Sequence, residues 1–368
     1  VQTWLSALAD QKPLLLAFED LHWMDSASAR LLEQIMPAVA HKPILILSTF
    51  RPEPERPAWR LREAARSTYS KYYTEAWLQS LINSDIQRMI EGLLETDLVP
   101  ELALDLVTRR TDGNPLFIEE LVRSMIDRGA LVPAKNHRWE LVQGWEEAAI
   151  PNTIQGILQA RIDRLERDVR RVLQLAACIG RQFSVRVLSE VCEGMEISPA
   201  RFTHSIQVLE EASLIQLEVD LPQKEYKFKH NLIRETVYQS LLKGTRSQLH
   251  GAIAQWYEAN WMDEPEMPYP LLAYHYERTD QVNKQREYFI RAGYQAARAY
   301  DNQDALTFFT KALALITNPL ERYELLLERE HVCDLIGARD QQRADLDELI
   351  KLAAQGQFDH QIAEAHYR

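Results

Sequence analysis

Two short runs of apolar residues near the start of the chain are each followed directly by polar or charged residues. The first covers residues 14–18 (LLLAF) and the second lies within residues 43–50 (PILILSTF). Runs of this length predict buried β-strands. Between them, Asp25 or Ser26 can cap a helix. The apolar face expected for this helix consists of Leu31, Leu32 and Ile35. A strand, a helix and a second strand in this order predict a parallel α/β unit with a right-handed crossover.

Helical periodicity dominates the rest of the first 150 residues. Residues 1–10 are expected to end a helix, and residues 52–80 to form a helix with a solvated face, followed by a short third strand near residues 72–78. Residues 83–130 are predicted to be helices, the first of them capped by Asn83 or Ser84. Its expected buried face consists of Ile86, Met89, Ile90 and Leu93. A small hairpin or loop is expected after residue 130.

The next segment, residues 151–242, combines helical periodicity with two short alternating strands. The strands are expected at residues 215–219 and 226–228. Helices followed by such a hairpin predict a winged-helix domain. Winged helices invite a DNA-binding interpretation. Acids roughly balance bases here, so direct DNA binding is not the preferred reading. The alternative predicts salt-sensitive duplex binding by this segment.

From about residue 271 the pattern changes to paired amphipathic helices, most clearly over residues 286–316. Small residues fall where two helices would cross, which resembles a tetratricopeptide repeat. A second copy is found by placing Ala305 on Ala344, and a third pair is expected to begin near Phe358. The concave face of such an array would sense a peptide or ligand. The aromatic residues expected mainly as repeat core are Tyr288, Phe289, Tyr294 and Tyr300.

Composition narrows the possible classes of protein. The 368 residues suggest two or three domains, and the low glycine content favours a helix-dominated chain. A net charge of −12 argues against a broad surface for nucleic acid or anionic membrane. Three widely separated cysteines in apolar helical contexts suggest a reducing compartment, the cytoplasm. No zinc or serine-hydrolase motif is present in the sequence.

Candidate chemistry lies where the two predicted strands end. Glu19 and Asp20 follow the first strand, and Arg51 follows the second. Carboxylates at this edge of a parallel sheet can hold Mg²⁺ and polarise an attacking water, and a guanidinium there can bind phosphate oxygens. The alternatives are an acidic turn and a surface arginine that serve only the fold.

Two strings of residues carry a resemblance to a known family. These are LLLAFEDLHWMDSAS, with its LHW-x-D extension after the acidic pair, and GNPLFIEEL at residues 113–121. Both are similar to the signal-transducing ATPases with numerous domains (STAND), a branch of the P-loop NTPases. The resemblance is closer to the subgroup found in large ATP-binding LuxR-type transcription regulators and in adenylate cyclases fused to an ATPase and tetratricopeptide repeats.

The resemblance implies a role for each candidate residue, with ATP or ADP and Mg²⁺ as cofactors. Glu19 and Asp20 would bind magnesium and serve catalysis, although the wider family has Asp-Asp or Asp-Glu here, so the division of roles between the two stays open. Arg51 would sense the terminal phosphate. Gly113 and Pro115 match a GxP motif whose proline contacts adenine. His230, at the start of a helix, would contact the β-phosphate of ADP, with Arg234 as a possible support. His22 and Trp23 would pack and position Asp20.

The expected fold is mainly α, with a partial parallel α/β nucleotide-binding domain, a winged-helix domain and tetratricopeptide-like repeats. The expected domains are the ATPase portion (1–80), a helical lid (81–150), the winged helix (151–245) and the repeats (246–368). The GxxxxGK[ST] phosphate-binding loop of the family is absent, so the sequence is interpreted as a fragment of a longer regulatory ATPase. An inducer or protein partner is expected on the repeats, with possible self-association on activation. The alternative is a scaffold whose ATPase is vestigial.

Overall fold

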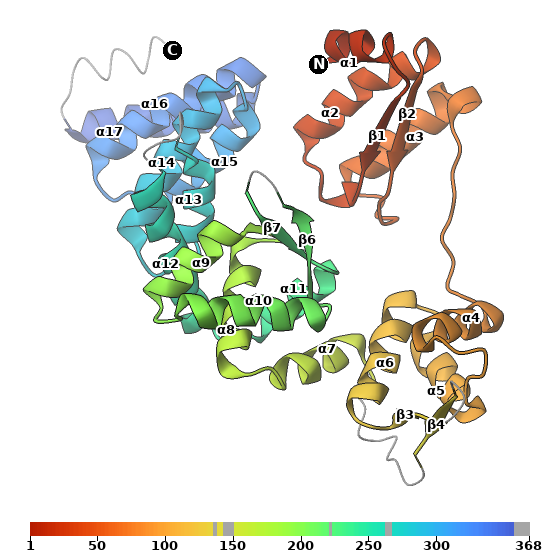
Figure 1. Cartoon of the computed structure of the whole chain (residues 1–368). Helices are drawn as coiled ribbons and strands as arrows, with labels where there is room; N and C mark the ends of the chain where they lie inside the picture. Colours follow the sequence, from red (N-terminus) through yellow and green to blue (C-terminus); the bar gives the residue numbers. More distant parts are fainter. Residues whose placement is uncertain (135–137, 143–150, 221–222, 262–266, 357–368) are drawn as a thin grey trace. The chain divides into compact units, whose positions relative to one another are not determined.

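The computed structural model describes residues 1–368 except 135–137, 143–150, 221–222, 262–266 and 357–368 (Figure 1). The chain divides into two compact units, Val1–Gln79 and Ser80–Arg368. Most described residues lie in helices, and the strands are few and short. The predicted mainly α fold is therefore confirmed.

The first unit is built on two parallel strands with helices packed on one face. Strand β1 pairs with β2 in register, from Leu14 with Ile44 to Phe18 with Ser48. The elements are α1 (Gln2–Ala9), β1 (Leu14–Phe18), η1 (Leu21–Trp23), α2 (Ser26–Ile35), η2 (Met36–Ala40), β2 (Ile44–Ser48), α3 (Pro57–Thr68) and η3 (Ser70–Tyr72). The parallel strand–helix–strand unit expected from the sequence is confirmed.

The two strands are covered on one face only. Alternate side chains of β1 and β2 pack with α2 and α3 around Leu32, Ile35 and Leu61. Leu15, Leu45 and Leu47 point to the other face and are 59%, 64% and 55% exposed. The continuous apolar runs therefore do not mark strands buried on both faces within the described chain.

Helix α2 begins as expected, because the Asp25 carboxylate accepts a hydrogen bond from the backbone nitrogen of Ser28 at 2.7 Å. The buried face of α2 is narrower than predicted, because Leu32 and Ile35 are buried whereas Leu31 is 41% exposed. Leu31 stands one position before Leu32, and adjacent helical residues do not share a face.

The third strand predicted at residues 72–78 is wrong. Residues 73–79 follow η3 without strand pairing. Side chains anchor this segment to α3 instead. The guanidinium of Arg62 hydrogen-bonds both carboxylate oxygens of Glu75, at 2.7 and 3.1 Å, and lies over the rings of Trp59 and Trp77.

The second unit starts with three helices and a hairpin that share one core. The elements are α4 (Asn83–Leu94), α5 (Glu101–Thr111), α6 (Pro115–Asp127), β3 (Leu131–Pro133) and β4 (Trp139–Leu141). The hairpin expected after residue 130 is confirmed, because β3 and β4 pair antiparallel. On α4, Ile86 and Ile90 are buried as predicted. Its N-cap is Ile82, without a side-chain cap, so the expected cap at Asn83 or Ser84 is wrong by one or two residues.

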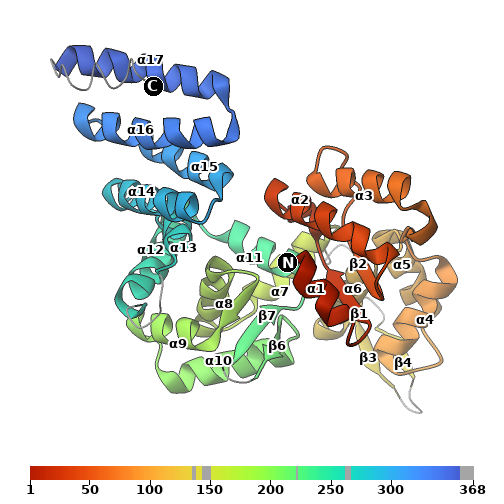
Figure 2. The same ribbon diagram turned by 90° about the horizontal axis from the view of Figure 1, so that it is seen from above.

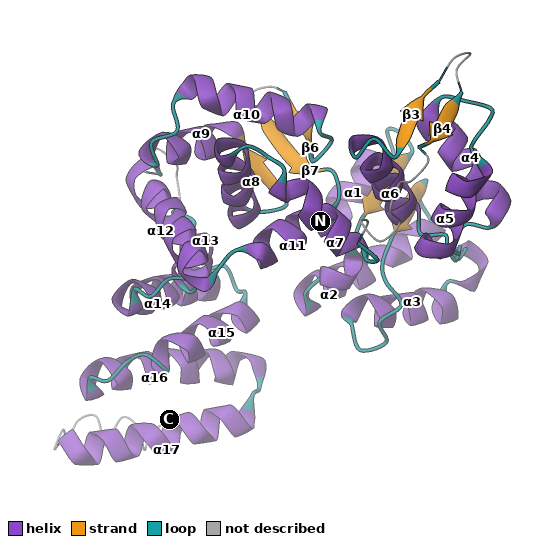
Figure 3. Ribbon diagram, turned by 90° about the horizontal axis from the view of Figure 1, so that it is seen from below, coloured by secondary structure: helices purple, strands orange, loops and turns teal. Residues whose placement is uncertain are grey.

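A three-stranded antiparallel sheet follows, in the order β5–β7–β6, beside a group of helices (Figure 3). The elements are α7 (Ile154–Asp163), α8 (Arg167–Ile179), β5 (Gln182–Ser184), α9 (Val185–Gly194), α10 (Pro199–Glu211), β6 (Ile215–Val219), β7 (Glu225–Phe228) and α11 (Asn231–Ser240). Both strands predicted for this segment are present. Strand β5 has only three residues, too few for a recognisable pattern in the sequence.

The last six helices stack in succession as a helical-repeat array (Figure 2). They are α12 (Lys243–Asn260), α13 (Tyr269–Tyr276), α14 (Val282–Arg298), α15 (Asn302–Leu313), α16 (Pro319–Ile336) and α17 (Arg339–Gly356). One hydrophobic core runs without a break from Leu158 in α7 to Ala353 in α17, so the array shares its core with the sheet-bearing segment.

The repeat alignment needs a correction. Ala305 is fully buried, whereas Ala344 is exposed. The buried positions of α15 instead match those of α17 when Ala305 is placed on Asp345. The third pair, expected near Phe358, lies outside the described residues. Among the aromatic residues expected as core, Tyr288 and Phe289 are buried, Tyr294 is half-buried, and Tyr300 is 85% exposed, so that expectation is wrong for Tyr300.

No helix among the described residues is both long and apolar enough to cross a membrane.

Candidate functional site

Backbone hydrogen bonds hold the carboxyl ends of β1 and β2 together. Thr49 donates its backbone nitrogen to the carbonyl of Phe18 at 2.9 Å, and its own carbonyl accepts from Leu21 at 3.0 Å. The Thr49 hydroxyl accepts from the backbone nitrogen of Asp20 at 3.3 Å. These bonds fix the turn that carries Glu19 and Asp20 against the chain that follows β2.

Asp20 adopts an uncommon backbone conformation at this edge. Its φ of 56° and ψ of 37° lie in the left-handed region, which costs energy for residues other than glycine and is tolerated best by Asp and Asn. Asp20 is half-buried, and Glu19 is exposed. Strained positions of this kind cluster at functional sites because the surrounding structure imposes them.

Arg51 lies three positions beyond the end of β2, at the same end of the sheet as the acidic pair. It is exposed, and its guanidinium makes no hydrogen bond or ion pair within the part of the chain that the structure describes. The cation is therefore available to an anionic group from solvent.

The two residues after Asp20 differ from each other. His22 is buried, and its Nδ1 has no hydrogen-bond partner among the described residues, so it packs as expected. Trp23 is 62% exposed, with its ring against His22 and under the guanidinium of Arg56. The expectation that Trp23 packs beside Asp20 is therefore wrong, because most of its ring faces solvent.

The turn between α5 and α6 brings Gly113 against the chain just before α4. Gly113 has φ +73° and accepts a hydrogen bond at its carbonyl from the nitrogen of Leu81 at 2.9 Å. The Asn114 side chain caps α6 by accepting from Phe117 at 3.1 Å. Pro115 is the first residue of α6 and is exposed. Glycine, a side-chain cap and a proline at the first helical position together specify this turn.

His230 is the N-cap residue of α11, but its side chain does not cap the helix. Its Nε2 is buried, has no hydrogen-bond partner among the described residues, and lies 3.9 Å from an oxygen of Glu119 on α6. Burial lowers the pKa of His230, and the Glu119 carboxylate opposes that shift. The structure thus brings His230 close to the helix that begins at Pro115.

Glu119 is the centre of a charged network that the sequence analysis missed. Lys229 donates to its carboxylate at 2.5 Å and Arg123 at 3.1 Å. Burial alone would raise the pKa of Glu119, but these two cations outweigh burial and lower it. The Nη1 atom of Arg123 also donates to the hydroxyl of Ser213, just after α10, at 3.3 Å.

The next residue, Glu120, makes a second link from α6. Its carboxylate pairs with Arg161 of α7 at 2.8 Å, and both side chains are largely buried. Arg161 also donates to the carbonyl of Ala212 at the end of α10. The sequence contains one indication of these ion pairs, namely two adjacent acids inside the apolar string PLFIEEL. Acids that are buried in a helix require cationic partners.

Arg234 does not join His230. Its Nε donates to the carbonyl of Ala177 in α8 at 3.2 Å, and its guanidinium lies over the ring of Tyr238. The suggested support of the His230 site by Arg234 is therefore wrong.

The predicted residues form two groups, each in its own unit. Glu19, Asp20 and Arg51 belong to the first, and Gly113, Pro115 and His230 to the second. Among the described residues, no set of three or more His, Cys, Asp or Glu side chains is placed to hold a metal ion. The two carboxylates at the strand end still fit Mg²⁺, which proteins commonly bind through one or two carboxylates while phosphates and waters complete the shell.

Part of the chain matches a family model, and most of it matches a curated protein. Residues 83–134 match a domain of unknown function, DUF8739. An uncharacterized protein of Rhizobium meliloti (strain 1021) is 26% identical over 323 residues. That match includes 84% of this chain but spans only 29% of the relative's length.

Among solved structures, one similar chain is a signal transduction ATPase with numerous domains that has a tetratricopeptide repeat sensor, from Pyrococcus horikoshii. The TM-score is 0.44 at 10% sequence identity, and the comparison covers 99% of this chain and 67% of that one.

Proposed function

We propose that the chain is the central part of a STAND-type regulatory ATPase in which ATP and ADP favour different arrangements of its parts. The observation that carries the proposal is the edge where β1 and β2 end. There a left-handed Asp20, the adjacent Glu19 and the cation of Arg51, which has no side-chain partner among the described residues, follow two parallel strands joined by backbone bonds to Thr49. Ligands of open parallel sheets bind at the carboxyl ends of the strands.

Each side chain at this edge has a proposed task. Glu19 binds on the magnesium side, and Asp20 orients and polarises the attacking water. The guanidinium of Arg51 donates to the terminal phosphate, where two parallel hydrogen bonds are possible. A bound Mg²⁺ supplies neutralisation of phosphate charge. In the opposite assignment, Asp20 binds magnesium and Glu19 polarises the water. Comparing Asp20→Asn with Glu19→Gln, as described below, distinguishes the two assignments.

The second unit contributes the contacts that distinguish ADP from ATP. Pro115 would contact adenine at the turn set by Gly113. His230 would donate to a phosphate of ADP, because its Nε2 is without a hydrogen-bond partner in the described chain and α11 begins at the next residue. Helix N-termini favour anions. Glu119, at 3.9 Å, is the group that a phosphate would displace from His230.

The remaining domains keep their proposed assignments. The order α8, β5, α9, α10, β6, β7 supports a winged-helix domain, since the last two strands form its hairpin. The repeats would be the sensor for an inducer. A LuxR-type regulator or an adenylate cyclase is the proposed type of whole protein, and the three free, buried cysteines are compatible with a cytoplasmic location.

The exposed leucines of the sheet support further α/β structure in the whole protein. Parallel sheets are generally covered on both faces. Leu15, Leu45 and Leu47 lie on a bare face. We propose that strands and helices from the region carrying the phosphate-binding loop cover it.

The test uses the longer native protein that contains this chain. Purified protein is denatured, released nucleotide is identified, and ATP turnover is measured. Asp20→Asn should lower turnover by at least about a hundredfold while nucleotide still binds. Asp10→Asn is the matched control, because Asp10 is an exposed acid of the same unit that pairs with Lys42, away from the strand ends. Unchanged turnover in Asp20→Asn would refute the catalytic assignment of Asp20. Glu19→Gln would then test whether Glu19 polarises the water instead.

The alternative is a scaffold whose ATPase is vestigial. A scaffold predicts no released nucleotide and no change in melting temperature with Mg-ATP. Specific binding at 100 times the dissociation constant would add about 2.7 kcal/mol to the stability.

A further inference from the structure

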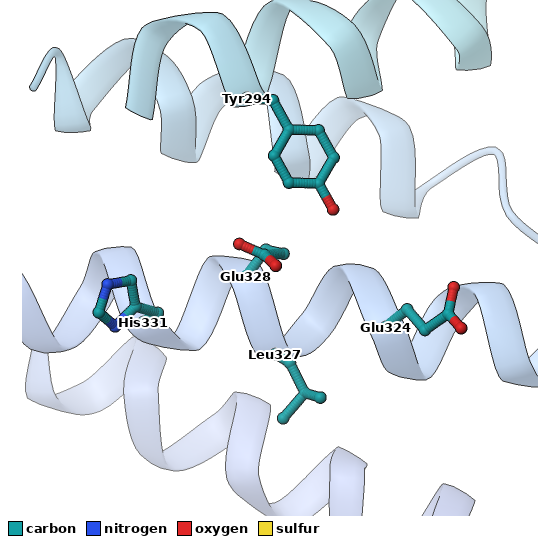
Figure 4. A pocket seen from close by; sticks show the side chains of 5 residues that line it. All are labelled: Tyr294, Glu324, Leu327, Glu328 and His331. Atoms are coloured by element: carbon teal, nitrogen blue, oxygen red, sulfur yellow. The ribbon is translucent and has the colours of Figure 1, made fainter. Parts of the chain in front are cut away.

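A hollow of about 500 Å³ lies between α14 and α16 in the helical-repeat array (Figure 4). Tyr294 contributes the α14 side. Residues of α16 contribute the other side: Glu324, Leu327, Glu328 and His331. Glu324 and His331 are exposed, so the hollow opens to solvent.

The polar groups of this hollow converge. Figure 4 shows the Tyr294 ring reaching from α14 toward α16, with its hydroxyl directed at the space between Glu324 and Glu328. In Figure 4, Glu328 lies on the side of α16 that faces α14, Glu324 extends along the helix, and Leu327 points to the far side of α16. The ring of Phe309 meets the Tyr294 ring edge-to-face at 5.5 Å and restricts its orientation.

Nearby acids on α16 and α17 are neutralised by cationic partners. Ion pairs cross between helices at Arg286–Glu321 (3.5 Å), Arg322–Glu348 (2.6 Å) and Arg329–Asp345 (2.6 Å). Glu324 and Glu328 have no ion pair or hydrogen bond within the described part of the chain. They stand one turn apart on one helix, where like charges repel each other.

The local potential is negative at the Tyr294 hydroxyl. Burial raises the pKa of Tyr294, and Glu328 and Glu324 raise it further, whereas Arg298 on the next turn of α14 opposes them with a smaller effect. Two carboxylates without a partner among the described residues, a half-buried phenol and space for several atoms favour an organic cation. The aromatic ring of Tyr294 offers a cation–π contact to such a group.

We propose that the hollow between α14 and α16 binds an aliphatic guanidinium or ammonium group through Glu324, Glu328 and Tyr294. The group would come from an arginine or lysine side chain of a peptide, or from a free amine of the same chemistry. This inference rests on the proposed sensor function for its biological meaning. The binding itself requires no nucleotide.

The first experiment is calorimetric titration of this chain with the capped tripeptide Gly-Arg-Gly. The same tripeptide with citrulline in place of arginine is the matched probe, because citrulline keeps the shape and lacks the charge. We expect the arginine peptide to bind at least about tenfold more tightly, with the difference shrinking as salt is added. Agmatine distinguishes the sources: equal or tighter binding of agmatine indicates a free amine, and tighter binding of the peptide indicates a peptide.

The second experiment locates the binding. The double variant Glu324→Gln, Glu328→Gln should weaken binding of the arginine peptide at least about tenfold. The control is Glu193→Gln, Glu211→Gln, which changes the net charge equally on α9 and α10 and should bind as the unsubstituted chain does.

Three results would overturn the proposal: no binding of either cation, equal affinity for the arginine and citrulline peptides, or equal loss in the two double variants. The comparison with citrulline needs no substitution, so it stands even where a variant loses stability. Because no nucleotide is present, failure here leaves the ATPase proposal untouched, and failure of ATP binding leaves this result untouched.

Discussion

A methyl group on Gly113 would lie 2.3 Å from the carbonyl oxygen of Leu81 and 2.8 Å from its nitrogen. Both atoms belong to the backbone, which cannot rotate aside as a side chain would. The φ of +73° adds a second penalty for any residue with a Cβ. The tight turn before Pro115 therefore depends on glycine for two separate reasons.

Gly113→Ala should lower the free energy of unfolding by about 2–4 kcal/mol. Gly129→Ala is the matched control. Gly129 has a similar φ of +67° but open space around it, so only the backbone cost of about 1–2 kcal/mol applies. Urea denaturation monitored by circular dichroism measures both values. Equal losses in the two variants would show that the close approach of Leu81 has no energetic weight.

At the scale of elements, the α14–α15 pair and the α16–α17 pair of the array pack their two helices together in different ways. In the α14–α15 pair, the ring of Phe309 packs directly on Gly293. A Cβ atom added to Gly293 would lie only 2.4 Å from that ring, so this close packing requires glycine. In the α16–α17 pair, a buried ion pair joins Arg329 of α16 to Asp345 of α17 by two hydrogen bonds, at 3.0 and 2.6 Å. A third hydrogen bond runs from Arg329 to the Thr310 hydroxyl of α15 at 3.0 Å.

Arg329→Met should destabilise the chain by about 3–5 kcal/mol, because it leaves the nearly fully buried Asp345 carboxylate without its cation. Adding Asp345→Leu should recover more than half of the loss, since apolar residues of similar volume often replace a buried pair without cost. Denaturant midpoints of the single and double variants measure this. A double variant less stable than the single one would contradict the expectation.

The elements that the sequence predicted well have strong local signals. The strand–helix–strand unit, the hairpin after residue 130 and the two strands β6 and β7 follow from short apolar runs and from alternation of apolar and polar residues. The failures depend on contacts between distant side chains. The bond from Arg62 to Glu75 replaces the third strand, and the pair at Asp345 shifts the repeat register that Ala344 had suggested.

The candidate site shows the same limit. The placement of Glu19, Asp20 and Arg51 just after β1 and β2 was predictable because strand ends can be read from the pattern of apolar residues. The partnership of Glu119 with Lys229 was not, because 110 positions separate the two residues and neither string indicates the other. Adjacent acids in an apolar helix can be noticed in a sequence, but their partners cannot be assigned from it.

At the scale of the whole molecule, the continuous core contains two fully buried histidines. Nδ1 of His250 lies 2.9 Å from Nδ1 of His275, and the hydroxyl of Tyr238 lies 3.0 Å from Nε2 of His250. Burial lowers the pKa of His250 to about 4, assisted by Arg278, and burial together with His250 lowers that of His275 to about 3.

Folding stability should therefore fall as the pH decreases below about 6.5, the pKa of an unfolded histidine. The unfolded chain takes up protons that the folded chain refuses, so each histidine costs about 1.4 kcal/mol per pH unit until its folded pKa is approached. Melting temperatures at pH 7.5 and 5.5 measure the effect. His275→Phe should reduce this pH dependence, whereas His204→Gln, at an exposed position on α10, should keep it. Equal pH dependence in both variants would refute the assignment.

The unbroken core from Leu158 to Ala353 also has a mechanical meaning. Where a flexible linker joins a helical-repeat array to the next domain, a movement of the array is absorbed by the linker and does not reach that domain. Here α12 packs against both α8 and α13, so the described helices connect the sheet-bearing segment directly to the stacked helices. A tilt of α16 relative to α14 would therefore be transmitted through the packed helices. The displacement would grow with distance from the point where the tilt begins.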